Sequence, residues 1–319
     1  MTRTRTSAGD LSFRIGTGAF ALFIIALVAA IGVVLWMQSR PSLDAFGLQF
    51  WRTEIWDPVA GNFGALPFIW GTLYSSLLAL LIATPVSIGI AVFISHTCRP
   101  NWRPPLVFLT ELLAAIPSIV YGLWGFLVLV PALRQLQLAL PDVVRALPLF
   151  SGPPVGVSLL AAAVILAIMI VPFTSSIARE VLEAVPPAQR EASFALGATS
   201  WEATKVALHY ARTGIVGAVM LGFGRALGET MAVTMVIGNT PKAAASIFAP
   251  QYTMAAVIAN EFTEAGDALH LGALVEIGLV LFIITLIVNV ASRLLLWTMT
   301  RQRRPSKAAV STPAQEAAA

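Results

Sequence analysis

Long runs of apolar residues alternate with short polar segments along this chain. The runs cover residues 19–37, 67–94, 105–133, 155–174, 215–237 and 271–297. A helix needs about 20 mostly apolar residues to cross a bilayer, and each run reaches about this length. The pattern predicts an all-α, polytopic membrane protein with six transmembrane helices, in which Pro117 and Gly122 kink or interrupt the third span.

The polar segments divide the chain into further parts. Residues 1–18 form a basic N-terminal segment, 38–66 a polar and aromatic connection, and 67–298 a core of five spans. Residues 299–319 form a basic, then Ala-rich tail with a composition typical of disorder. The run at 19–37 is longer than a signal peptide usually provides and no small-x-small cleavage site follows it, so a retained first span is predicted.

Composition supports a membrane protein and excludes several other classes. Hydrophobic residues make up 57% of the chain and charged residues 11%, whereas soluble domains carry about 25% charged residues. The net charge of +4 does not indicate nucleic-acid binding, because the cations lie in short loops beside apolar runs. A single cysteine, Cys98, excludes an internal disulfide and a cysteine-based metal cage.

Lysine and arginine are distributed unequally between the two sides that six spans define. The side with both termini, the second-to-third loop and residues 176–214 carries 14 of the 20, and the opposite loops carry five. Positive residues are retained in the cytoplasm. We therefore expect cytoplasmic termini, a cytoplasmic segment at 176–214 and a periplasmic segment at 38–66, in a multi-pass protein of a bacterial inner membrane.

Residues 176–214 are a polar insert longer than a link between two spans requires. Apolar residues recur at helical spacing over 177–185, and a second helix begins at Pro187, where a missing N–H costs little. Gly197 permits a turn after Leu196, and a third helix over 201–208 leads back to the membrane. Two interpretations are open, a helix lying on the lipid surface or a helix docked in a groove of a cytoplasmic partner.

At the centre of this insert, Glu191-Ala192-Ser193 is followed by Gly197. The pattern resembles the EAA loop of ATP-binding-cassette importer permeases, which reads Glu-Ala-Ala, three residues, Gly, and later Ile-x-Leu-Pro. Here Ser193 replaces the second alanine and the proline of the close is missing. The resemblance implies coupling to an ATP-binding subunit through Glu191, Ala192, Ser193, Leu196 and Gly197.

Three further stretches, residues 111–122, 221–233 and 260–262, are similar to signatures of phosphate-importer permeases of the PstC type. The resemblance runs from about residue 50 to residue 292. It implies a type I importer permease that pairs with a homologous PstA-type subunit, two PstB-type ATP-binding subunits and a periplasmic phosphate-binding protein. The chain contains no Gly-x-x-x-x-Gly-Lys-Ser/Thr loop, so ATP and Mg are expected on the partner subunits and no catalysis on this one.

Arg225 and Glu229 stand inside the fifth apolar run, four residues apart, which places them on one helix face. A charge near the middle of a membrane costs from about 2.5 to over 10 kcal/mol, so both should face protein or a water-filled path. They could form a structural ion pair. Alternatively, Arg225 presents its planar guanidinium to phosphate in transit and Glu229 holds or releases it. Gly224 and Gly228 form a small-x-x-x-small pair that predicts close helix packing.

The sequence leaves the roles of several other acidic residues undecided and permits other functions. Glu111 could lie near the membrane interface or be buried and paired. An acidic cluster follows the fifth span and consists of Glu261, Glu264 and Asp267 with His270. We expect it to be a solvated docking surface rather than a metal site. The competing functions are a permease for another oxyanion or solute, an ion-coupled secondary transporter and a structural scaffold. The large cytoplasmic insert argues against the secondary transporter.

Overall fold

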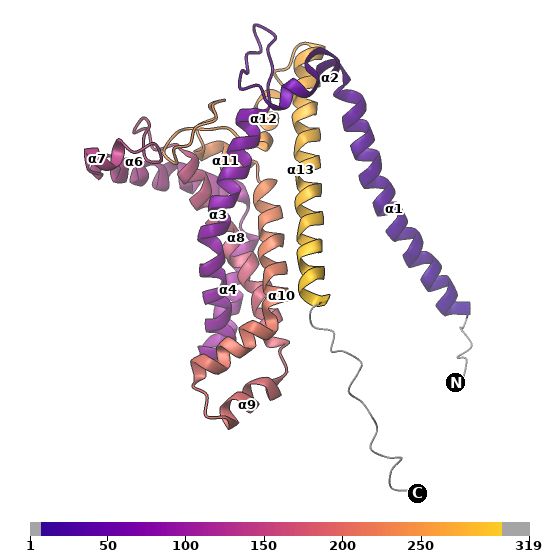
Figure 1. Cartoon of the computed structure of the whole chain (residues 1–319), viewed down its shortest axis with the longest axis vertical. Coiled ribbons are helices and arrows are strands. Elements are labelled where there is room, and N and C mark those ends of the chain that lie inside the picture. Colours follow the sequence, from indigo (N-terminus) through magenta and orange to yellow (C-terminus); the bar gives the residue numbers. More distant parts are fainter. Residues whose placement is uncertain (1–7, 302–319) are drawn as a thin grey trace, which may run out of the picture. The chain divides into compact units, whose positions relative to one another are not determined.

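The computed structural model describes residues 8–301 and is mainly helical, with only two isolated β-bridges in this part of the chain. Residues 1–7 of the N-terminal segment and most of the tail predicted to be disordered lie outside the described residues. Six helical stretches of the described chain are long and apolar enough to cross a membrane, which confirms the predicted number. Figure 1 shows the elements in chain order, coloured along the sequence.

The first half of the chain runs from the first span to the end of the third. The short 3₁₀ and π-helical segments are named η. The elements are α1 (Ala8–Gln38), α2 (Arg40–Phe46), η1 (Gly47–Trp51), α3 (Leu66–Val92), η2 (Phe93–Thr97), η3 (Pro100–Trp102), α4 (Arg103–Ala115), α5 (Ser118–Trp124), η4 (Gly125–Leu129), α6 (Val130–Ala139) and α7 (Asp142–Arg145).

The second half of the chain contains the insert and the last three spans. Its elements are α8 (Leu159–Glu183), α9 (Pro187–Ala195), α10 (Ser200–Leu227), α11 (Met231–Val236), α12 (Met254–Glu261) and α13 (Ala268–Arg301).

The third span begins later than the sequence predicted. The interruption expected at Pro117 is confirmed, because the helix stops at Ile116, whose ψ of 129° is extended. The residue before a proline is sterically pushed out of the helical region. The apolar stretch long enough to span is Ser118–Ala139. The third span therefore also ends later than the apolar run 105–133 predicted, since α6 continues to Ala139.

The helices predicted at the two ends of the insert are continuous with the fourth and fifth spans. Helix α8 continues past the fourth apolar run to Glu183, and α10 is one helix from Ser200 to Leu227. Nothing in the polar ends of these helices breaks an α-helix, so the helix continues where hydrophobicity ends. Only α9 is a separate element (Figure 1).

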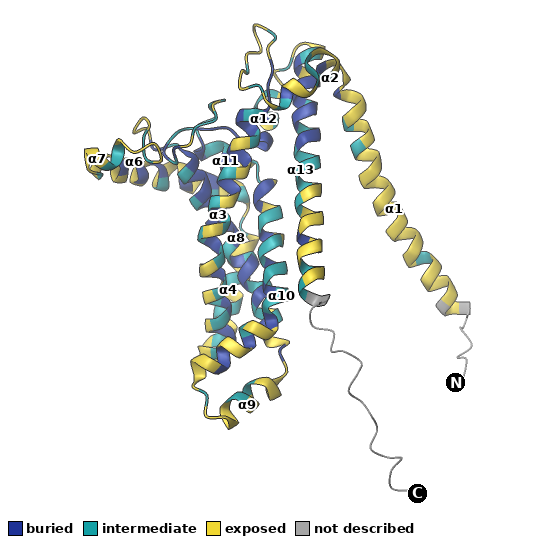
Figure 2. Ribbon diagram, in the orientation of Figure 1, coloured by how far each residue is buried: buried dark blue, intermediate teal, exposed yellow. Residues whose placement is uncertain are grey.

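The chain divides into two compact units. Unit 1 comprises residues 1–76, 118–165 and 228–285, and unit 2 comprises residues 77–117, 166–227 and 286–319. Each contains its own apolar cluster, so each can be described by itself. Helix α1, in unit 1, is exposed over nearly its whole length, as the yellow ribbon of Figure 2 shows.

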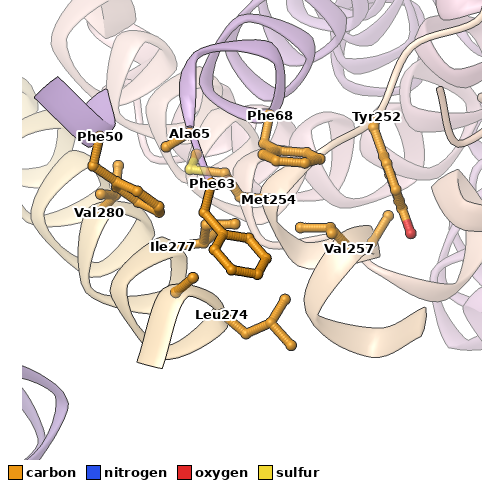
Figure 3. Packing of buried hydrophobic residues seen from close by; sticks show 12 residues of the cluster. Phe50, Phe63, Ala65, Phe68, Tyr252, Met254, Val257, Leu274, Ile277 and Val280 are labelled. Carbon is orange, nitrogen blue, oxygen red and sulfur yellow. The ribbon is translucent and has the colours of Figure 1, made fainter. Parts of the chain in front are cut away.

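The core of unit 1 is aromatic and aliphatic. Phe50, Phe63 and Phe68 pack with residues of α12 and α13, and all three rings are at most 2% exposed. Figure 3 shows Phe50 beside Val280 and Phe63 beside Ile277 of α13, with Phe68 near Met254 of α12. This packing orders the connection between α1 and α3 against α12 and α13.

The core of unit 2 consists largely of small residues. Ala178 and Leu182 of α8 pack with alanines of α10 at positions 207, 211 and 218. Small side chains permit the backbones of membrane helices to approach closely. The tightest places are Gly214, whose added Cβ would lie 2.4 Å from Val181, and Gly222, whose added Cβ would lie 2.5 Å from Thr174.

Candidate functional site

The isolated helix α9 has ends that the sequence specifies. Pro187 occupies its first position, after an extended Pro186 with ψ 132°. Gly197 ends it with φ +82°, a left-handed conformation that favours glycine. The amide of Ala198 donates to the carbonyl of Ser193 at 3.1 Å, and the amide of Gly197 donates to Phe194 at 2.9 Å. Both bonds belong to a Schellman C-cap, so the predicted short helix and its turn are confirmed.

The chain leaves α9 and enters α10 through a second capping arrangement. The side chain of Glu202 accepts hydrogen bonds from the amide of Thr199 at 2.7 Å and from its hydroxyl at 2.8 Å. The amide of Glu202 in turn donates to the hydroxyl of Thr199 at 3.4 Å. This reciprocal capping box satisfies backbone groups that a helix start leaves unpaired. The turn between α9 and α10 is therefore ordered at both ends.

The side chains predicted to couple are mostly exposed. Glu191, Ala192, Leu196 and Gly197 face outward, and Leu196 is 90% exposed. Ser193 is half-buried, and its hydroxyl donates to the carbonyl of Gln189 at 2.9 Å. Phe194 and Trp201, close to Leu196 in the chain, are exposed as well, and several exposed apolar side chains in one segment favour an interaction surface.

Arg225 lies in the last turn of α10 and is exposed. Its guanidinium carbon is 5.8 Å from the centre of the Phe173 ring on α8, within the range of a cation–π contact. None of the ion pairs in the described part of unit 2 involves Arg225. The cation is thus held by a ring and keeps its hydrogen-bond donors available.

The helix-face argument for Glu229 was wrong. Helix α10 ends at Leu227, and Gly228, Glu229 and Thr230 connect it to α11 in a non-helical conformation. Because the helix stops, the i,i+4 relation between Arg225 and Glu229 does not form. Glu229 is half-buried, and its carboxylate accepts from the amide of Ala232 at 3.5 Å, at the start of α11.

The close helix packing predicted at Gly224 and Gly228 occurs at other glycines of α10. A Cβ added at Gly224 or Gly228 would meet no atom of the described chain within 4 Å. The close approach belongs to Gly214 and Gly222, which together with Ala218 form a small residue every fourth position of α10. The sequence contained both patterns, but the apolar run did not show which face meets α8.

Two members of the acidic group near residue 261 are part of the packing of unit 1. The carboxylate of Glu261 accepts from Trp56 Nε1 at 2.9 Å and lies 3.3 Å from His270 Nε2. His270 is 7% exposed and stacks on Phe63. The expectation of a solvated docking surface is therefore wrong for Glu261 and His270. Glu264 and Asp267 are exposed, and the described residues contain no group of three metal ligands.

Two further carboxylates complete the description. Glu111, which the sequence left open, is 60% exposed at its side chain and lies 4.0 Å from Arg179 Nη2. Glu276 of α13 is fully buried and accepts from Trp51 Nε1 at 3.2 Å. Sequence reasoning missed Glu276, although a lone acidic residue within an apolar run is a signal that could have found it.

Sequence comparison with known proteins identifies the family of this chain. The chain is 45% identical over 298 residues to the phosphate transport system permease protein PstC of Mesorhizobium japonicum, covering 92% of this chain and 91% of the relative. It is 46% identical to PstC of Haemophilus influenzae, covering 91% and 94%. The chain belongs to the PstC family. A probable PstC of Methanocaldococcus jannaschii is 37% identical to this PstC-family chain, covering 85% and 88%.

Solved structures agree on the fold of this PstC-family protein. Two crystal forms of the inward-facing MetNI methionine ABC transporter contain a chain that matches with a TM-score of 0.54 and 19% identity. The match covers 73% of this chain and at least 94% of that one. No family model matches the chain. The protein is therefore an all-α, multi-pass membrane protein with the fold of an ABC importer permease.

Proposed function

We propose that this chain is the membrane-spanning permease subunit of an ATP-driven importer of inorganic phosphate. The observation that carries the proposal is the 44–46% identity, over more than nine-tenths of the chain, to several proteins named phosphate transport system permease protein PstC. The subunit pairs with a homologous PstA-type permease, two PstB-type ATP-binding subunits and a periplasmic phosphate-binding protein. ATP and Mg bind to the partners, and the chain itself catalyses no reaction.

Arg225 is the group we propose to meet phosphate in transit. A guanidinium offers a planar set of donors that matches two oxygens of an oxyanion. Its contact with the Phe173 ring at 5.8 Å orients the cation without using those donors. An anion in transit needs a site that it can leave, and a single unpaired arginine provides a shallow one. Glu229 is proposed as a second charged group of the path on the resemblance alone.

Helix α9 is the element we propose to contact the ATP-binding partner. It is the only separate helix between α8 and α10, and Leu196 beside it is 90% exposed. A hollow of about 540 Å³ lined by Gln189, Val206, His209 and Tyr210 adjoins it. A hollow next to α9 and an exposed apolar side chain at the end of that helix suit a partner that docks on α9. The excess of lysine and arginine on this side supports placing α9 and both termini in the cytoplasm.

The test is transport by the co-expressed complex in liposomes. We expect ATPase activity stimulated by phosphate with its binding protein, and uptake of phosphate but not of sulfate. Uptake of sulfate instead would identify another oxyanion, and gradient-driven uptake without the ATP-binding subunits would identify a secondary transporter. Absence of any phosphate-dependent activity in an intact complex contradicts the proposal.

The variant Arg225→Gln tests the proposed path. We expect it to assemble normally and to lose phosphate uptake, because glutamine keeps hydrogen-bonding capacity but removes the charge. Arg225→Lys should retain only part of the activity, since an ammonium lacks the planar fork. Arg293→Gln, which removes an exposed cation from α13 in unit 2, is the matched control. Wild-type uptake by Arg225→Gln would show that Arg225 has no role in the path.

A further inference from the structure

A polar network joins the ends of three helices in unit 2. The guanidinium of Arg103, at the start of α4, donates from Nε to the carbonyl of Ile94 at 2.9 Å and from Nη2 to the carbonyl of Ser95. Both carbonyls belong to the turn η2 that ends α3. Carbonyls at the end of a helix lack internal partners, so Arg103 satisfies two of them and ties α4 to α3.

The same arginine reaches the end of α8. Arg103 Nη2 lies 3.8 Å from the carboxylate of Glu183, the last residue of that helix. Glu183 also accepts from Arg179 at 3.2 Å, one turn back along α8, and Arg179 lies 4.0 Å from Glu111 on α4. The Arg179 side chain is only 13% exposed. Charges held in a partly desolvated network interact more strongly than isolated surface pairs.

Within the described residues, one side-chain hydrogen bond attaches helix α9 to this network. Arg190, in the middle of α9, places Nη1 3.3 Å from Nδ1 of His96 in η2. Every nitrogen of an arginine side chain is a donor and none is an acceptor. The Nδ1 atom of His96 must therefore accept, which requires a neutral ring with its proton on Nε2.

The environment of His96 places it between α9 and the ends of α3, α4 and α8. The charged groups that act on it are Arg190 from α9, Arg103 from α4 and Glu183 from α8. Ala91 of α3 packs in one apolar cluster with Leu182 of α8 and with Val185, which follows that helix. A displacement of α9 therefore reaches three helix ends through one short chain of contacts.

We propose that Arg190 and His96 are positioning residues that transmit displacement of α9 to the ends of α3, α4 and α8. The proposal rests on the proposed contact of α9 with an ATP-binding subunit, and it adds which groups of this chain receive the motion. Helix α9 is also linked through the backbone at both of its ends, to α8 through residues 184–186 and to α10 through the turn that Thr199 and Glu202 cap. The backbone leads from α9 to α8 and α10 only, so the contact between Arg190 and His96 is the direct link from α9 to the end of α3.

The principal test uses the co-expressed complex in liposomes, with ATP hydrolysis and phosphate uptake measured in the same sample. Arg190→Met should keep ATPase activity and lower the phosphate taken up per ATP by about tenfold, because a hydrogen bond to a charged group is lost. His96→Leu should do the same, and the double variant should be no worse than either single one. Additive losses would show that Arg190 acts on another group, which overturns the proposal.

Conservative variants separate positioning from general damage. His96→Asn keeps an acceptor near the position of Nδ1, and Arg190→Lys keeps a donor, so both should recover uptake per ATP. Lys205→Met is the matched control. It removes a cation that lies over Trp201 of α10, at 5.3 Å, and outside the network. Failure of both conservative variants to recover uptake contradicts the proposal.

A second measurement does not depend on phosphate. In the purified complex, Arg190→Met should raise hydrogen exchange of the α9 amides about tenfold relative to wild type and to Lys205→Met, because α9 loses its contact with η2. Unchanged exchange together with unchanged uptake per ATP refutes the positioning role while the importer function stands. If the wild-type complex moves no phosphate, the importer proposal fails, and the exchange result alone decides whether Arg190 and His96 hold α9.

Discussion

Gly222 provides the sharpest test of the packing that positions Arg225. A Cβ added to Gly222 would lie 2.5 Å from Thr174 Oγ1 and 2.8 Å from Ile170 Cγ2. Both neighbours are 1% exposed, and β-branched side chains in a helix have few alternative rotamers. Neither can rotate away, so Gly222→Ala must push α10 away from α8.

The magnitude follows from two opposing terms. Overpacking a filled interior costs about 1–3 kcal/mol, and replacing glycine by alanine in a helix contributes about 1 kcal/mol of stability. Gly222→Ala should therefore lower the free energy of unfolding by about 0–2 kcal/mol. Gly224→Ala, on the same helix with no atom within 4 Å of its Cβ, receives only the stabilising term. The difference between the two variants, about 1–3 kcal/mol, isolates the steric contact.

The assay is unfolding of the purified protein in detergent, followed by circular dichroism. The structure also predicts a functional effect, because Ile170 and Thr174 flank Phe173, whose ring lies 5.8 Å from the Arg225 guanidinium. Separation of α10 from α8 should lower phosphate uptake in Gly222→Ala more than in Gly224→Ala. Equal stability of the two alanine variants would refute the claimed contact.

Two further predictions concern single residues outside the spans. Burial raises the pKa of Tyr252 to about 12, so its contribution to stability is complete below pH 10 and is lost as the pH rises through 12. Tyr252→Phe should lose unfolding free energy less steeply over that interval, and equal slopes would contradict this. Gly197→Ala should cost about 1–2 kcal/mol from its φ of +82°, with Gly197→Asn affected less. The loss of stability should appear as faster amide hydrogen exchange at the end of α9. Identical exchange in the wild type and in both variants would contradict the predicted backbone strain.

Short-range features of this protein were readable from its residues. Apolar runs of about 20 residues predicted six spans, and Pro117 predicted the interruption before α5. Pro187 and Gly197 specified both ends of α9, because each acts through the backbone of its own position. The resemblance of residues 221–233 and 111–122 indicated the family that the comparisons then confirmed.

Long-range features were decided only by tertiary structure. Helices in lipid gain little from hydrophobic contact with one another, so an apolar run does not show which face packs. The choice of Gly222 over Gly224 therefore depends on where α8 lies. Helix α10 ends at Leu227, so Arg225 and Glu229 do not share a helix. No proline in the sequence marks this end.

The amino-acid sequence by itself determined the spans, the charge bias and the caps of α9, since these depend on local composition and backbone geometry. Only the folded chain determined that Arg103, Glu183 and His96 meet around α9. Arg103 and Glu183 are 80 positions apart and His96 and Arg190 are 94 positions apart, and the packing of the helices decides which of their ends meet. Charge pairing at that distance has no signal in a single sequence, because any cation on one side could meet any of several carboxylates there.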